Sequence, residues 1–266
     1  ISETLKSIDD VERAIYLFEW AMKQPNYAHN SSTYVALMWI LAQAKEFGKI
    51  WELLEEMKLA GFELKLDYFN VLIKSYGEFG KYDEAIHTLR EMPNFGVSPT
   101  LYLYNAVISV LIKDQKLDMA IGIYRELVVN PELANEFAFN MMIHGFSESG
   151  RMDDALGVVD DMKKVNVHMG RVTWTTLIDG FCNVGNIEKA IQMFSDMKDS
   201  GIMPNVVTYS ALIKGLCKVG RVDDAMNYLQ SMRKEGCVPN AITYTVLVDG
   251  LCKGERVDEG KRFLDE

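Results

Sequence analysis

The hydrophobic positions of this chain form short stripes that alternate along the sequence, and each stripe has the spacing of one helix face. In one stripe the apolar residues recur at i, i+3, i+4 and i+7, as at Tyr209, Leu212, Ile213 and Leu216. Gly220 then ends the helix, and Asp223 gives the next helix an acidic first turn. The second stripe holds Val222, Ala225, Met226, Leu229 and Met232. The pattern therefore predicts a helix–turn–helix unit.

This unit recurs every 35 residues without insertion or deletion. Six complete repeats are predicted, at residues 31–65, 66–100, 101–135, 136–170, 171–205 and 206–240. Residues 241–266 form a truncated seventh repeat, and residues 1–30 hold a partial N-terminal repeat and cap, with its second helix at 11–22. A chain that starts and stops within a unit is expected for a fragment of a longer array.

Neither helix of a unit can bury its apolar stripe alone, so successive units must stack. We therefore predict an all-α fold, an α-solenoid whose first helices line one surface and whose second helices line the other. Hydrophobic residues make up 48% of the chain, which is enough for a sizeable core. No stretch has the roughly 18 uninterrupted apolar residues of a membrane span.

The cysteines follow the repeat and do not form a ligand set. Cys182, Cys217 and Cys252 are 35 residues apart, so each is expected to fill the same small packing position, and Cys237 lies between two repeats. No CxxC pair is present, and no histidine lies at ligand spacing. We expect reduced thiols, no metal site and no cofactor.

Segments such as VTYSALIKGLCKVGRVDDAMNYLQSM…GCVPN resemble the pentatricopeptide repeat in its plain 35-residue form, the P class. The resemblance covers residues 31–266 and is most specific from Arg171 onward. The tetratricopeptide repeat fits less well, because its period is 34 and its W-x₂-L-G-x₂-Y opening is missing. The resemblance implies a right-handed superhelix that binds single-stranded RNA, one base per repeat. It also implies an organellar location in a plant, the mitochondrion in preference to the chloroplast.

The resemblance further implies that the fifth and last residues of a repeat form a base-reading pair, and that the second residue, here called the packing residue, packs against the base. The base-reading pairs are Asn70 with Thr100, Asn105 with Asn135, Asn140 with Gly170, Thr175 with Asn205, Ser210 with Asn240, and Thr245 without a partner. The packing residues are Tyr102, Phe137, Val172, Val207 and Ile242. The fifth residues have both donor and acceptor groups, as base-edge readout requires. The family's pairing habits imply the tract pyrimidine–C/U–pyrimidine–A–A–purine.

The first two repeats depart from this pattern. Val35, paired with Lys65, cannot form a base-edge hydrogen bond through its side chain. Asp67 stands where an apolar packing residue belongs, and its charge would repel phosphate. We therefore expect these repeats to be structural and to cap the array.

The net charge of −10 argues against a general nucleic-acid binder, because phosphate affinity comes largely from Lys and Arg. The excess of acidic residues lies outside the first helices, however. Lys113, Lys218 and Lys253 share one repeat position, where family members approach phosphate. We expect base stacking and hydrogen bonding to supply most of the affinity.

Motifs of catalysis are missing from the sequence: it has no glycine-rich phosphate loop, no HExxH and no GxSxG. We therefore expect no enzyme. The favoured hypothesis is a non-catalytic, sequence-specific RNA-binding protein of organelle RNA metabolism, acting in transcript stabilisation, splicing, processing or translation. The alternative is a protein-interaction scaffold, such as a ribosome-associated repeat protein whose acidic surface contacts basic proteins. Protein partners and self-association stay open, and no membrane partner is expected.

Overall fold

The computed structural model describes residues 1–8, 10–130 and 134–264, and within these residues the regular elements are all helical. The helices are α1 (Ser2–Lys6), α2 (Val11–Met22), α3 (Ser31–Gln43), α4 (Phe47–Leu59), α5 (Leu66–Glu78), α6 (Tyr82–Glu91), the 3₁₀ helix η1 (Met92–Phe95), α7 (Leu101–Lys113), α8 (Leu117–Val129), α9 (Glu136–Glu148), α10 (Met152–Lys164), α11 (Arg171–Asn183), α12 (Ile187–Asp199), α13 (Val206–Lys218), α14 (Val222–Lys234), α15 (Ala241–Lys253) and α16 (Val257–Leu264). The predicted all-α solenoid of helix pairs is confirmed. Within the described residues, no helix is both long enough and apolar enough to cross a membrane.

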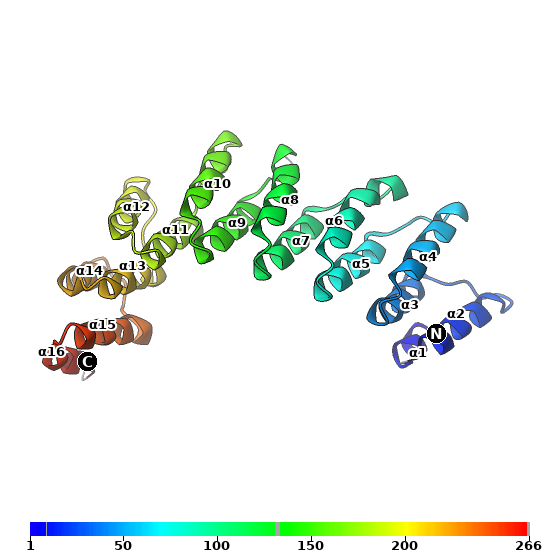
Figure 1. Ribbon diagram of the computed structural model, residues 1–266, viewed down its shortest axis with the longest axis horizontal. Coiled ribbons are helices and arrows are strands. Elements are labelled where there is room, and N and C mark those ends of the chain that lie inside the picture. The colour runs from blue at the N-terminus through cyan, green and yellow to red at the C-terminus, as the bar shows by residue number, and fades with distance from the viewer. Residues whose placement is uncertain (9, 131–133, 265–266) are drawn as a thin grey trace. The chain divides into compact units, whose positions relative to one another are not determined.

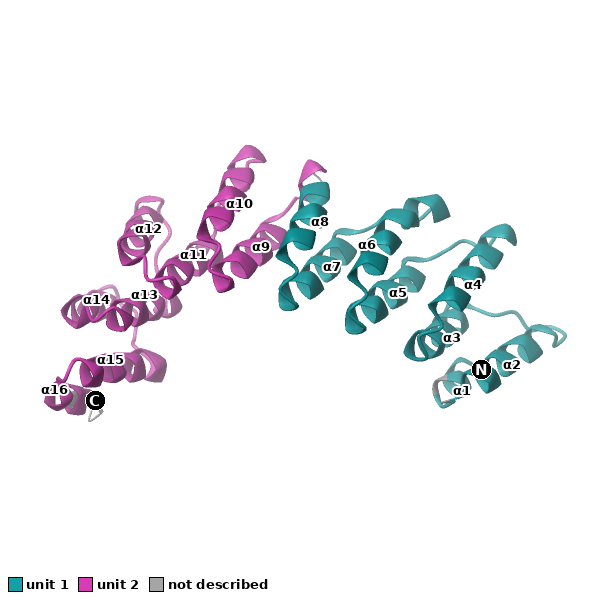
Figure 2. Ribbon diagram, viewed as in Figure 1, with its two compact units in different colours: residues 1–127 teal, residues 128–266 magenta. Residues whose placement is uncertain are grey.

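The chain divides into two compact units, residues 1–127 and residues 128–266 (Figure 2). In the N-terminal unit the first helices α3, α5 and α7 pack in sequence, and the second helices α4 and α6 lie to one side of them (Figure 1). In the C-terminal unit α9, α11, α13 and α15 pack in the same way. Each unit is thus a stack of helix pairs.

Local signals explain where the first helices begin and end. The seven first helices, α3 to α15 in odd numbers, begin at the residues where the 35-residue repeats were predicted to begin. Asn30 and Asn205 are two of the N-cap residues, and the side chain of each accepts a backbone N–H of the first turn. After each first helix one residue has a left-handed backbone, and Gly220, with φ of 79°, ends α13 as predicted. At Lys45, Gln115 and Glu255 a non-glycine residue takes this conformation.

Aromatic rings form much of the core of the N-terminal unit. His29 stacks on Phe18, with ring centroids 3.8 Å apart, and Trp51 donates a hydrogen bond from Nε1 to the Tyr76 hydroxyl at 3.1 Å. Pro93 interrupts the second helix of one repeat, because proline lacks a backbone N–H and clashes with the preceding turn. The chain there continues as the 3₁₀ helix η1.

Small residues set the packing of first helices in the C-terminal unit. A Cβ added to Gly215 would lie 2.3 Å from Cys182 Sγ, and one added to Gly250 would lie 2.6 Å from Cys217 Sγ. Both thiols are buried, and burial raises the pKa of Cys182 to about 12 and that of Cys217 to about 11. The shared packing position is confirmed for these two cysteines. Cys252 is exposed, and the described residues contain no cluster able to hold a metal ion.

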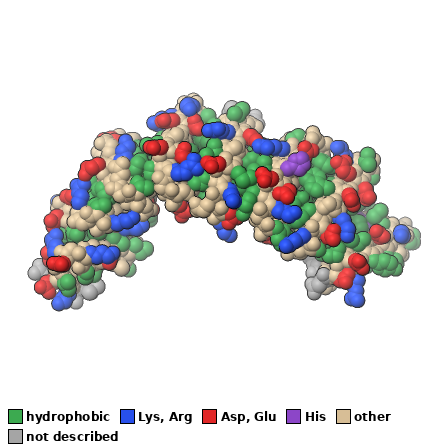
Figure 3. Space-filling view, viewed as in Figure 1, with side chains coloured by type: hydrophobic (Ala, Val, Ile, Leu, Met, Phe, Trp, Pro, Cys, Tyr) green, Lys and Arg blue, Asp and Glu red, His purple; other side chains and the backbone are tan. Residues whose placement is uncertain are grey.

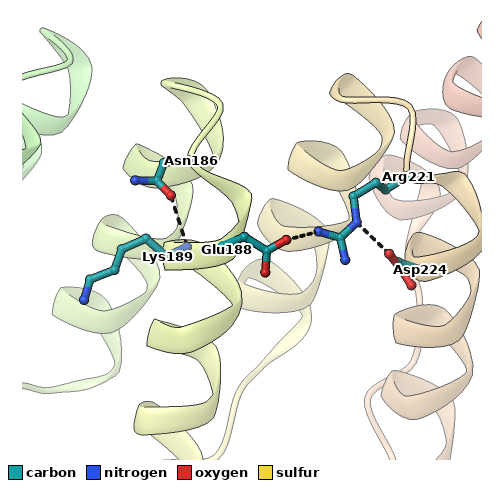
Figure 4. A network of polar contacts seen from close by, with 5 residues as sticks. All are labelled: Asn186, Glu188, Lys189, Arg221 and Asp224. Carbon is teal, nitrogen blue, oxygen red and sulfur yellow. Dashed lines mark hydrogen bonds and ion pairs between the residues drawn. The ribbon is translucent and has the colours of Figure 1, made fainter.

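Arginines link the second helices of the C-terminal unit. Arg221 Nη1 lies 2.5 Å from Glu188 of the preceding repeat, and its Nε lies 2.6 Å from Asp224 of its own repeat (Figure 4). Beside this cluster, Asn186 caps α12 by accepting the backbone N–H of Lys189. Arg256 repeats the arrangement one unit later, at 2.6 Å from Asp223 and 2.7 Å from Glu259. These pairs therefore engage part of the acidic excess in contacts between neighbouring repeats at the surface.

Candidate nucleic-acid interface

A row of large apolar side chains is exposed at the second position of the repeats. The exposed fractions are 65% for Tyr102, 60% for Phe137, 62% for Val172, 62% for Val207 and 66% for Ile242. These are all five of the predicted packing residues. Tyr102 lies in the N-terminal unit and the other four in the C-terminal unit. Exposed hydrophobic side chains that gather in one patch typically mark a binding surface.

The predicted fifth residues lie next to this row on the first helices. Asn70, Asn105, Asn140, Thr175 and Ser210 are half-buried, so each presents only part of its side chain to solvent. Thr245 is exposed, and its hydroxyl donates to the carbonyl of Ala241 at 2.7 Å. Asn105 Oδ1 is buried with no hydrogen-bond partner among the described residues.

Three of the predicted last residues cap the following helix. The Oδ1 atoms of Asn135, Asn205 and Asn240 accept the backbone N–H of the third residue of the next repeat at 3.0 Å. Thr100 and Gly170 make no such side-chain bond. Because Oδ1 of a capping asparagine is engaged in the helix, its Nδ2 group supplies the donors that remain for a ligand.

A buried threonine joins the two members of a predicted base-reading pair. This link was not predicted from the sequence. Ser210 Oγ lies 2.8 Å from Thr243 Oγ1, which donates to Asn240 Oδ1 at 3.0 Å. In the preceding repeat Thr175 lies 2.7 Å from Thr208, which donates to Asn205 at 3.0 Å. The spacing Asn-x-x-Thr, a variant of the capping box, was the available sequence signal for these threonines.

A shallow groove of about 300 Å³ crosses four successive first helices of the C-terminal unit, α9, α11, α13 and α15. It brings together the fifth residues Thr175 and Ser210 with the packing residues Val207 and Ile242. In the N-terminal unit a separate groove of about 490 Å³ contains Asn70, Tyr102 and Lys113 among its lining residues. In each unit, therefore, predicted base-reading and packing residues share one concave surface.

The lysines near these grooves are mostly engaged within the protein. Lys218 Nζ donates to the Asn183 carbonyl at 2.8 Å, and Lys253 lies 2.7 Å from Asp249. Lys113 is exposed in the last turn of α7. Basic and acidic side chains are interspersed on the face drawn in Figure 3. Positive charge is therefore not concentrated in one patch on that face, which is consistent with the net charge of −10.

In the groove of the C-terminal unit, charge is balanced locally. Lys214 Nζ lies 3.6 Å from Asp179 of the preceding repeat, and the Asp179 carboxylate also accepts Asn183 Nδ2 at 3.0 Å. His144 lies in the same groove and 3.6 Å from Glu148. A carboxylate therefore stands among the groups that would face a phosphate chain.

The two early repeats differ in their side chains at the same positions. Val35 is half-buried, and Lys65 and Asp67 are exposed. Lys65 stands at the N-cap of α5 and makes no side-chain capping bond. The prediction that these repeats cap the array remains a prediction.

Family models match the chain along nearly its whole length. The model described as PPR repeat family matches residues 134–182, 169–218 and 204–253, and the one described as PPR repeat matches 102–130 and 242–266. The pentatricopeptide repeat domain model matches residues 78–114, and a model described as pentatricopeptide repeat-containing protein matches 1–92. Together these matches span residues 1–130 and 134–266.

Curated relatives in Arabidopsis thaliana are similar over about a third of the chain. A putative pentatricopeptide repeat-containing protein is 37% identical over 83 residues, which are 31% of this chain and 13% of the relative. A relative named as mitochondrial is 35% identical over 102 residues, 37% of this chain and 16% of its own length. A relative named as chloroplastic is 31% identical over 98 residues, 36% of this chain and 13% of its own length. Each match thus spans a small part of a longer protein.

Solved structures share the fold. The pentatricopeptide repeat protein PPR10 from maize is 20% identical and superimposes with a TM-score of 0.71, covering 99% of this chain and 37% of that one. The same protein in complex with an 18-nucleotide psaJ RNA element gives 0.66 at 21% identity, covering 99% of this chain and 40% of that one. Yeast Rmd9p in complex with a 16-nucleotide target RNA gives 0.59 at 10% identity, covering 99% and 56%.

Proposed function

The chain belongs to the pentatricopeptide repeat family, and we propose that it binds single-stranded RNA in a sequence-specific manner, one base per repeat, without catalysing a reaction. The observation that carries this proposal is the groove in which Thr175 and Ser210 alternate with the exposed side chains of Val207 and Ile242. Apolar side chains can hold a base by its face, while the polar residues contact its edge. The similarity in fold to proteins solved with bound RNA supports the proposal.

The bases follow from the base-reading pairs. We assign adenine to Thr175 with Asn205 and to Ser210 with Asn240, and pyrimidines to the pairs that begin with Asn70, Asn105 and Asn140. Asn105 with Asn135 takes cytosine or uracil, and Thr245 takes a purine. The proposed tract is pyrimidine–C/U–pyrimidine–A–A–purine, in the 5′ to 3′ direction along the chain.

The setting is an organelle, the mitochondrion in preference to the chloroplast. Relatives named as mitochondrial and chloroplastic support an organellar location. The protein would act by occupying a short RNA tract, and so protect a transcript from nucleases or prevent it from folding. Occupancy of this kind can serve transcript stabilisation, splicing, processing or translation.

A second candidate function is a protein-interaction scaffold, favoured by the net charge of −10 and by the internal partners of Lys218 and Lys253. Such an acidic surface would dock on basic proteins, including those of a ribosome. A protein-interaction scaffold would not need side chains with hydrogen-bond donors and acceptors at the fifth position of each repeat.

Selection from a random single-stranded RNA pool tests the two candidates. RNA binding predicts an enriched tract with two consecutive adenines, whereas no enrichment at any salt concentration would favour the scaffold. Val207→Ala should weaken binding to the enriched RNA because it trims a packing residue. Val238→Ala is the matched control, since Val238 is 77% exposed but lies outside the groove.

A further inference from the structure

We infer that the buried third-position threonines Thr208 and Thr243 are positioning residues, which make the preceding base-reading pair accept adenine and reject guanine. The inference rests on the proposed function. It concerns the hydrogen-bond chain Ser210–Thr243–Asn240 and its equivalent Thr175–Thr208–Asn205. Both threonines are 0% exposed, so they reach a ligand only through their neighbours.

The direction of each hydrogen bond follows from Asn240. Its Oδ1 accepts the backbone N–H of Thr243 at 3.0 Å, which fixes the amide oxygen toward the helix. An amide oxygen cannot donate, so the Thr243 hydroxyl donates its one proton to Asn240 Oδ1 at 3.0 Å. The 2.8 Å contact between Ser210 and Thr243 therefore requires Ser210 to be the donor.

This leaves a defined pattern at the surface. The hydroxyl proton of Ser210 is used, so Ser210 Oγ offers lone pairs and acts as an acceptor. Oδ1 of Asn240 is engaged by two donors, so Nδ2 offers its protons. The pair presents one acceptor and one donor, and the same argument applies to Thr175 with Asn205.

Adenine is the purine that complements this pattern. Its N6 amino group donates beside a ring nitrogen that accepts, whereas guanine offers O6 and N7 as two acceptors on the same edge. On its Watson–Crick edge guanine places an acceptor where adenine has a donor and a donor where adenine has an acceptor. Guanine would therefore leave Ser210 Oγ and Asn240 Nδ2 facing like groups, and such unpaired polar groups reduce affinity.

Other repeats show that the cap and the threonine bond are separable. Asn135 caps the N–H of Ala138 at 3.0 Å although alanine has no hydroxyl. Thr173 follows Gly170, which has no side-chain acceptor, and it donates instead to Asn140 Oδ1 at 2.7 Å. The third-position hydroxyl thus orients the fifth residue of the preceding repeat, even where it has no part in capping.

The test is Thr243→Val in the full chain, measured with four RNA oligonucleotides of the selected tract that differ only at the base assigned to Ser210 and Asn240. The parent should bind the adenine oligonucleotide more tightly than the guanine one. In the valine variant this ratio of affinities should fall about fivefold or more, the effect expected from losing one oriented hydrogen bond. Thr243→Ser keeps the hydroxyl and should keep the ratio. Preference at the base assigned to Thr175 should not change.

Thr33→Val is the matched control. Thr33 donates to Asn30 at 2.9 Å in the same capping arrangement, but no base-reading pair precedes it. It should lower stability as Thr243→Val does and leave every base preference unchanged. Thr208→Val repeats the test one base earlier, should Thr243→Val not fold.

Two outcomes are decisive in different ways. An unchanged adenine-to-guanine ratio in a valine variant that binds RNA would overturn the role of the threonine and leave RNA binding intact. A parent chain that binds none of the oligonucleotides would overturn the proposed function, and the inference with it.

Discussion

The first helices α3 and α5 of the N-terminal unit meet through aromatic rings, whereas α11 and α13 of the C-terminal unit meet through small residues and hydroxyl groups. Between α3 and α5, Tyr34 lies edge-on to Tyr68, and Lys74 lies over the ring of Trp39 at 5.2 Å. Between α11 and α13, Cys182 packs on Gly215 and Thr175 contacts Thr208. The period is the same, but the chemistry of the contact differs.

The difference shows how one scaffold can separate support from recognition. Ring contacts bury large apolar areas and leave few oriented donors or acceptors at the surface. Hydroxyl contacts contribute less burial, but each fixes which atom of a neighbouring polar group faces solvent. Base discrimination is therefore expected mainly from the C-terminal unit, in the repeats that begin at Arg171 and Val206.

The largest expected effect concerns the small-residue contact. Gly215→Ala should destabilise the C-terminal unit by about 1–3 kcal/mol, the usual cost of overpacking, because the new Cβ would lie 2.5 Å from Cys182 Cβ. Hydrogen exchange of α11 and α13 amides measures the loss, with α5 amides as the internal reference. Gly157→Ala is the control: nothing lies within 4 Å of that Cβ in helix α10, so the change should stabilise by about 0.5–1 kcal/mol. An equal increase in the exchange of α5 amides would show that the effect of the substitution is not confined to the C-terminal unit.

The second effect concerns recognition. Ser210→Asn converts an adenine pair into the type found at Asn105 and Asn135, and should shift preference to cytosine or uracil at that base by about tenfold. Oligonucleotide binding at the single varied base measures the shift. The reverse change in the N-terminal unit, Asn70→Ser, should give no adenine preference, since its partner is Thr100 and not asparagine, and since the next third residue, Leu103, has no hydroxyl. A gain of adenine preference there would remove the distinction between the units.

A smaller effect is expected from the charge pair in the groove. Asp179→Asn should raise RNA affinity about two- to fivefold at low salt, because it frees Lys214 to approach phosphate. Titration with the selected RNA at several salt concentrations measures the affinity and should show a steeper salt dependence. Asp160→Asn removes the same charge beside Lys163, at 3.2 Å on the second helix α10, and serves as the control. Equal gains in both variants would indicate an effect of net charge alone.

The smallest effect tests the aromatic unit. Burial lowers the pKa of His29, and its hydrogen bond to the Phe18 carbonyl, at 2.9 Å, opposes this only in part. The folded state therefore favours neutral imidazole. Its contribution to stability is complete above the ordinary histidine pKa and is lost as the pH falls toward the lowered value. Protection factors of α2 and α3 amides, which are exchange rates taken relative to the intrinsic rate at each pH, should fall between pH 7 and 5 in the parent and less so in His29→Gln, while α13 should show no such difference.

Helix boundaries and the exposed row could be predicted from the sequence because both depend on local patterns. The period placed the first helix of each repeat, and Gly220 marked the end of α13. Val207 and Ile242 were expected at the second position of their repeats from the resemblance to the repeat family, and both are exposed. These features need only one repeat at a time.

The hydrogen-bond chains could not be derived in the same way, because they join residues about 33 positions apart, as in Ser210 with Thr243. The internal partners of Lys218 and Lys253 were equally hidden, since any surface lysine can extend into solvent. The early end of α6 had a visible cause in Pro93, but the regular period concealed it.

The contact of Ser210 with Thr243 has a consequence for how arrays of such repeats change during evolution. Its two residues belong to adjacent 35-residue blocks, so a duplication or deletion of one block also replaces a neighbour of the block before it. A recombined gene would then encode altered specificity at two bases, one from the inserted pair and one from the repeat upstream. If the exchanged repeats have the same residue at their third position, the specificity of the repeat upstream stays unchanged. This would favour keeping threonine at the third position throughout a lineage.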